Sequence, residues 1–125
     1  MNKEVKKLFY NGVDSFNAKE YYDAHEYFEE IWTEHQLEDR LFIQALIQLS
    51  VAYFHISNFN KNGAIGLFNK ALSKLNKYID HDELILNINS VIESAKISYQ
   101  IVIEINDISK FNWDLAPRLD VKDQK

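Results

Sequence analysis

The feature that most constrains this chain is an apolar repeat of about 3.6 residues that runs through almost its whole length. One proline and three glycines stand among 125 residues, so the sequence has little of the turn chemistry that strand hairpins require. Apolar residues at every third or fourth position line one face of an α-helix. Because 46% of the residues are apolar, a chain of this length can bury a core of its own. The sequence therefore predicts a single all-α domain.

Five helices are expected, each with an apolar stripe followed by a polar break. The third, RLFIQALIQLSVAYFHIS, is apolar on nearly every side and should lie at the centre of the bundle. Asp39 precedes it as its predicted N-cap. The stretch 97–105 is rich in Ile and Val, so a strand is the main alternative there. The apolar stripes run from Val5 to Phe16, Tyr21 to Trp32, Leu41 to Ile56 and Ala64 to Ile79, and the fifth helix is expected from about Asp82 to Asn106.

The last residues lose the helical period. We expect residues 1–107 to form the helical bundle and residues 108–125 to form a tail. Phe111, Trp113 and Leu115 are predicted to hold the first half of this tail against the bundle. Its polar end should fray.

An internal echo links the second helix to the fourth. Ala24 and Phe28 recur 40 residues later as Ala64 and Phe68. A small residue followed by an aromatic residue at this spacing is similar to the tetratricopeptide helix pair. Because that repeat spans roughly 34 residues and normally needs three copies, the echo indicates tetratricopeptide-like helix hairpins rather than an array.

Composition excludes several classes of function. The net charge is −5, so binding to nucleic acid through a basic stripe is not expected. Without cysteine, disulfides and thiolate metal sites are excluded. Charges are scattered through the N-terminus, so it does not resemble a signal peptide, and no apolar segment has the length of a membrane span. A soluble cytoplasmic protein is therefore expected, and the excess of Asn, Lys and Ile suggests the bacterial cytosol or a plastid stroma.

The second helix carries the first half of a candidate site, within YYDAHEYFEEIW. At 100° per residue, His25 lies at the edge of the apolar face and Glu29 lies about 40° further out. Glu26 and Glu30 project to the opposite, solvated side. Glu29 is therefore the glutamate that pairs with His25 as an i, i+4 neighbour.

The third helix carries the second half. Gln44, Gln48 and His55 fall within about 40° of one another, and buried amides without partners cost about 1–3 kcal/mol each. If the two helices form an antiparallel hairpin, positions whose numbers sum to about 73 lie at one level. His25 is then expected to meet Gln48, and Glu29 is expected to meet Gln44.

A binding pocket beside this polar seam is also expected. Its aromatic walls would be Tyr21, Tyr22 and Trp32. His55 should come near Ala18 and Tyr21 at the first turn. If Gln48 is the partner of His25, Gln48→Leu should destabilise the fold by about 1–3 kcal/mol.

These residues together carry a resemblance to a family. FNAKEYYDAHEYFEEIW, QALIQLSVAYFH and NGAIGLFNKAL resemble the domain of unknown function 309 family, over about residues 8–78. The resemblance implies a helical bundle with tetratricopeptide-like packing and implies no established activity. Lys19 stands where the family usually has glycine, which costs about 1 kcal/mol if that turn needs a positive φ. The matching positions are Phe16, Tyr21, Ala24, His25, Glu26, Glu29, Trp32, Gln44, Gln48, His55, Gly63 and Ala64.

Three interpretations of the seam remain open. We favour a non-catalytic module, with the seam fixing the bundle or binding a protein or small molecule. A metal site could use His25 and Glu29 with Glu26 or His55, but HEYFE departs from the HExxH motif, so neither a metal nor a cofactor is assigned. Acid-base catalysis by the His25 and Glu29 pair is the third interpretation. Neither a nucleic acid nor a membrane is expected as partner, and a homo-oligomer stays open.

Overall fold

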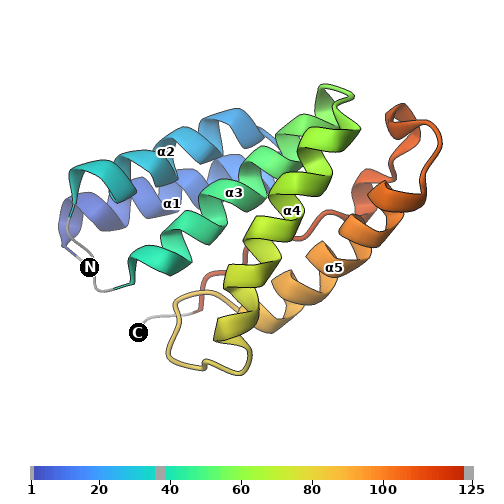
Figure 1. Cartoon of the computed structure of the whole chain (residues 1–125). Coiled ribbons are helices and arrows are strands. Elements are labelled where there is room, and N and C mark those ends of the chain that lie inside the picture. The colour runs from blue at the N-terminus through green and yellow to red at the C-terminus, as the bar shows by residue number, and fades with distance from the viewer. Residues whose placement is uncertain (1, 36–38, 123–125) are drawn as a thin grey trace.

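A computed structural model describes residues 2–35 and 39–122 of the chain. The described part contains five α-helices in series, and successive helices run in opposite directions (Figure 1). This arrangement confirms the predicted all-α bundle. The helices are α1 (Lys3–Asn17), α2 (Tyr21–Glu34), α3 (Arg40–Ser57), α4 (Lys61–Leu75) and α5 (Ile88–Glu104), with the short 3-10 helices η1 (Asn76–Tyr78), η2 (Ile108–Lys110) and η3 (Trp113–Leu115).

Helix α3 lies between α2 and α4 and packs against both (Figure 1). Its apolar residues contact neighbours on several sides, as its nearly uniform hydrophobicity predicted. The ring of Tyr53 is fully buried at the centre of the bundle, and its hydroxyl donates to Ser98 Oγ of α5 at 2.8 Å. The buried residues of α3 are Phe42, Ile43, Ala45, Leu46, Leu49, Ser50, Ala52, Tyr53 and Ile56.

Two turns of the same shape join the helix hairpins. Lys19, between α1 and α2, has a φ of 63°, and Phe59, between α3 and α4, has a φ of 59°. In each turn the following residue donates its N–H to the carbonyl five positions earlier, at 2.9 and 2.8 Å. These are the hydrogen bonds of a Schellman C-cap, which usually has glycine at the left-handed position. The turns stand 40 residues apart, the same offset as the predicted internal echo, and the positive φ considered for Lys19 is present.

The predicted helix boundaries are wrong between α4 and α5. We expected the fourth helix to reach Ile79 and the fifth to begin near Asp82, but α4 ends at Leu75 and α5 begins at Ile88. Behind Leu75 the chain tightens into η1, which buries Tyr78 and leaves Ile79 44% exposed. Tyr78 therefore takes the inward place that the periodicity assigned to Ile79.

The Tyr78 hydroxyl also changes the role expected of Asp39. Asp39 occupies the N-cap position of α3, but its side chain makes no capping hydrogen bond. Its carboxylate accepts the hydrogen bond of the Tyr78 hydroxyl instead. Asp39 thus ties the start of α3 to η1, which follows α4.

The stretch for which a strand was the alternative is helical. Residues 97–104 belong to α5, whose apolar face, including Val91, Ala95 and Val102, is buried against the bundle. β-Branched residues lower helix propensity by only tenths of a kcal/mol each. Burial of one face therefore outweighs the local preference.

The C-terminal segment crosses the far side of the bundle in Figure 1 and is anchored at several points. Phe111 is buried, and Leu119 is clamped by Asn17 of α1. The N–H of Leu119 donates to Asn17 Oδ1 at 2.8 Å, and Asn17 Nδ2 donates back to the Leu119 carbonyl at 3.0 Å. An isolated β-bridge then pairs Val121 with Leu86. The frayed end that we expected falls on residues 123–125, outside the described part.

None of the helices in the described part combines the length and the apolarity needed to cross a membrane.

Candidate functional site

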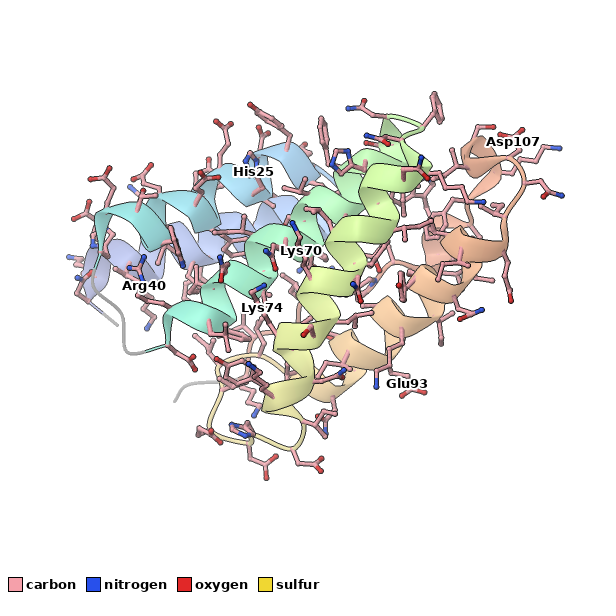
Figure 2. All side chains as sticks on the ribbon, in the orientation of Figure 1. His25, Arg40, Lys70, Lys74, Glu93 and Asp107 are labelled. Carbon is pink, nitrogen blue, oxygen red and sulfur yellow. The ribbon has the colours of Figure 1, made fainter. Side chains whose placement is uncertain are left out.

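The candidate site is a half-buried stripe along α3 and the side chains of α2 and α4 beside it, which we call the seam face. The stripe recurs every three or four residues, so it occupies one side of the helix. In Figure 2, His25 lies on α2, Arg40 at the start of α3, and Lys70 and Lys74 where α3 and α4 pass each other. The seam face comprises His25, Glu29 and Trp32 of α2, Arg40, Gln44, Ile47, Gln48, Val51 and His55 of α3, and Leu67, Lys70 and Lys74 of α4.

His25 is held by two contacts within its own helix. Its Nδ1 lies 2.8 Å from the carbonyl oxygen of Tyr22, and its Nε2 lies 3.2 Å from a carboxylate oxygen of Glu29. The predicted i, i+4 pair is therefore present. Both ring nitrogens therefore face oxygen atoms of α2.

The predicted register between α2 and α3 agrees with two contacts across the hairpin. The rings of Tyr22 and Phe54 lie 5.3 Å apart, and the Arg40 guanidinium stands 4.3 Å above the Trp32 ring. The residue numbers of these two pairs sum to 76 and 72, close to the predicted sum of about 73. Gln48 therefore lies level with His25, close to where the sum of about 73 placed it.

The prediction that His25 bonds to Gln48 and Glu29 bonds to Gln44 across this hairpin is wrong. Gln48 Oε1 is buried and has no hydrogen-bond partner among the residues described. His25 uses its nitrogens on Tyr22 and Glu29, and the Glu29 carboxylate faces His25 rather than Gln44. A partner one turn away on the same helix is placed by the backbone, so less side-chain freedom is lost in reaching it. The premise behind a destabilising Gln48→Leu is therefore removed.

Tyr21 is not a wall of the seam. It is 3% exposed and lies in the aromatic core, where its ring stacks on Tyr53 at 5.3 Å and on Trp113 at 5.8 Å. Burial raises the pKa of its phenol far above the ordinary value. Tyr21 therefore joins the tail to the core, since Trp113 belongs to the C-terminal segment.

His55 turns toward α4 rather than toward the first turn. Its Nδ1 lies 3.3 Å from Asn60 Nδ2, and a Cβ added to Gly63 would lie 2.9 Å from its Cγ. We expected His55 beside Ala18 and Tyr21, but it is packed at the α3–α4 turn. The helix backbone at Gly63 approaches the imidazole too closely for any side chain.

The two remaining residues of the predicted site, Glu26 and Trp32, lie in different environments. Glu26 is exposed, on the side that the helical wheel assigned to it. Trp32 is half-buried and is covered by Arg40 through the cation–π contact described above. Trp32 therefore belongs to the seam face, whereas Glu26 does not.

Sequence reasoning missed the cations on α4. Because Gly63 lies against His55, positions of α3 and α4 whose numbers sum to about 118 share a level. Lys70 then lies level with Gln48, and Lys74 lies level with Gln44. The same register arithmetic, applied to the hairpin that turns at NFNKNG, would have found both lysines.

The chemistry of the seam face is that of hydrogen bonding and positive charge. Within the described ranges, no group of three His, Cys, Asp or Glu side chains is placed to hold a metal ion. The ion pairs found there within 4.0 Å involve Arg118 and histidines, so Lys70 and Lys74 have no carboxylate partner in that part of the chain. The stripe therefore offers carboxamides flanked by ammonium groups.

Clear pKa shifts elsewhere have structural causes. Burial raises the pKa of the Tyr53 phenol in the core. Hydrogen bonds from the side chain and backbone of Ser109 lower the pKa of Asp107 in the turn behind α5. Neither group belongs to the seam face.

Comparison with known proteins bears on the first half of the chain. A family model described as domain of unknown function (DUF309) matches residues 9–67, which include α2, α3 and the start of α4. No curated protein matches the chain, and no solved structure matches it. Lys70 and Lys74 fall outside the matched range. Residues 9–67 are therefore similar to the domain of unknown function 309 family.

Proposed function

We propose that the chain is a non-catalytic binding or scaffold module that holds its partner on the seam face. The observation that carries this proposal is the Gln48 carboxamide, whose oxygen is buried without a hydrogen-bond partner in a half-buried stripe. An unsatisfied buried acceptor costs about 1–3 kcal/mol, and such groups in folded proteins require an explanation. We propose that on binding the Gln48 side chain turns its buried oxygen toward the partner, which then donates a hydrogen bond to it and offsets this cost.

The alternative is a metal-dependent or acid-base enzyme at the same seam, acting on a small molecule. The contact of His25 with Glu29 favours it, because a carboxylate orients an imidazole for proton transfer. A metal site needs three or four protein donors, however, and the described residues place no third His, Cys, Asp or Glu beside this pair. This donor set supports the binding module over a metal-dependent enzyme.

The proposal extends to packing, partners and location. The matching turns at Lys19 and Phe59, and the fully buried Ala24 and Ala64, support tetratricopeptide-like packing of the two hairpins. The partner we propose is a protein or a small molecule, rather than a nucleic acid or a membrane, and a second copy of the chain is compatible with it. The acidic, cysteine-free composition supports a cytoplasmic location.

The proposal is tested by mapping ligands onto the protein by NMR. A library of small molecules and short peptides is screened, and amide chemical shifts are followed in the ¹⁵N-labelled chain. Hits should perturb residues 44–55 and 67–74. Gln48→Leu should weaken these hits and leave the melting temperature unchanged or raised, since it removes an unsatisfied buried acceptor.

A matched control is Gln100→Leu, on the exposed side of α5, which should leave binding unchanged. Hits that map elsewhere, or that survive Gln48→Leu, would overturn the proposal.

The alternative function, a metal-dependent enzyme, is tested by elemental analysis of protein purified without chelator. Stoichiometric metal that is lost in His25→Ala and kept in Glu26→Gln would replace the binding module with a metal site.

A further inference from the structure

The seam face carries a local excess of positive charge on an acidic protein. The chain has a net charge of −5, yet Arg40, Lys70 and Lys74 all lie on this face (Figure 2). Its carboxylate, Glu29, is engaged by His25. The two lysines have no carboxylate within 4.0 Å among the described residues. This charge distribution is complementary to an anionic partner.

The carboxamides between these cations specify more than charge. Each glutamine side chain has one carbonyl acceptor and two N–H donors, the same groups that a peptide bond presents. Gln48 in addition has an oxygen that lacks a donor. Once the Gln48 side chain turns its oxygen outward, a peptide N–H can donate to it while peptide carbonyls accept from the carboxamide N–H groups. A carboxylate or a fully ionised phosphate has only acceptors and leaves this oxygen unpaired.

The length of the row of polar side chains on α3 indicates a linear partner. Arg40, Gln44 and Gln48 follow one another at intervals of four residues along α3, which spans about 12 Å. About four residues of an extended peptide cover that distance. Half-buried Ile47, Val51 and Leu67 provide apolar surface beside the polar groups. A nucleic acid, the other linear polyanion, would need a more extended set of cations than these three.

We propose that the seam face binds an acidic peptide segment of a partner protein, with its backbone amides on Gln44 and Gln48 and its carboxylates on Lys70 and Lys74. Aliphatic side chains of the peptide lie against Ile47, Val51 and Leu67. This inference rests on the proposed binding function of the same face and adds the chemistry of the partner.

The experiment uses a fluorescein-labelled octapeptide that alternates glutamate and leucine, with capped ends, and measures its fluorescence anisotropy against the full chain. Its counterpart with glutamine in place of glutamate should bind about tenfold more weakly. Binding of the acidic peptide should also weaken as the salt concentration rises from about 0.1 M to 1 M, because the Debye length falls to about 3 Å.

Two double variants isolate the lysines. Replacement of Lys70 and Lys74 by Gln should weaken binding of the acidic peptide about tenfold, toward the level of its glutamine counterpart. Replacement of Lys3 and Lys7 by Gln removes the same charge at the same spacing from exposed positions of α1 and should leave binding unchanged. Equal losses in the two variants would mean that only net charge matters, which overturns the inference.

The outcomes also separate this inference from the proposed function. If the acidic peptide does not bind, or binds no better than its glutamine counterpart, the inference fails. In that case the proposed function still stands when other ligands of the NMR screen map to the seam face. If no ligand maps there, both fail.

Discussion

Lys19 stands in the left-handed region, where a side chain is costly, and Lys19→Gly should stabilise the protein. The φ of 63° brings Cβ close to the following carbonyl oxygen, which costs about 1–2 kcal/mol for an L-residue. Glycine removes this clash but gains freedom in the unfolded chain, which offsets about 0.4–1 kcal/mol. The net gain expected in the free energy of unfolding is about 0.5–1 kcal/mol. Lys19 is exposed, so no buried contact is lost.

Thermal unfolding followed by circular dichroism measures this gain. For a domain of this size, about 1 kcal/mol raises the melting temperature by roughly 3–6 °C. Phe59→Gly should behave similarly, because it has the same turn geometry at a φ of 59° and is 67% exposed. Ala18→Gly is the matched control, since Ala18 is exposed at a φ of −84° and should show no gain. The reasoning is refuted if Lys19→Gly is no more stable than the parent, or if Ala18→Gly gains equally.

Three other changes test the core and the tail. Gly12→Ala should lower the midpoint of urea unfolding, despite better helix propensity, because the added Cβ would lie 2.5 Å from the buried ring of Phe28; a raised midpoint would contradict this packing. Asn17→Ala should speed hydrogen exchange at Leu119 and destabilise the fold by about 1–3 kcal/mol, since both of their hydrogen bonds are lost; unchanged exchange would mean that the clamp does not hold the tail. Burial raises the pKa of Tyr53 in the folded state. The contribution of its neutral phenol to the free energy of unfolding is therefore complete below about pH 10 and decreases as the pH rises further. Tyr53→Phe should therefore reduce the alkaline slope of the unfolding free energy by up to about 1.4 kcal/mol per pH unit, and an unchanged slope would mean that another group dominates.

The predictions from periodicity succeeded where the signal was local. The apolar stripes specified α1, α2 and α3 almost to their ends, because burial of one helical face determines which residues are helical. The same angular reasoning located the polar stripe of Gln44 and Gln48 on α3. It also placed that stripe level with His25, because the length of a turn sets the register of a helix hairpin.

Side-chain partners within the site could not be predicted in this way. His25 had acceptors within reach on its own helix and a carboxamide at the same level on α3, and rotamers decide between them. The structure directs it to Tyr22 and Glu29 and leaves the Gln48 oxygen unpaired. Lys70 was missed because the level argument was applied to one hairpin and not to the next.

The sequence by itself determined the helical class, the core stripes and the seam on α3, because these depend on residues three or four positions apart. Tertiary structure decided the features that depend on distant residues. The clamp of Asn17 on Leu119 joins residues 102 positions apart, and the bridge of Leu86 with Val121 joins the segment before α5 to the C-terminal segment. No local period encodes such contacts, since their energies exist only once the bundle has brought both segments together. The site was likewise completed by the second hairpin, whose register brings Lys70 level with Gln48.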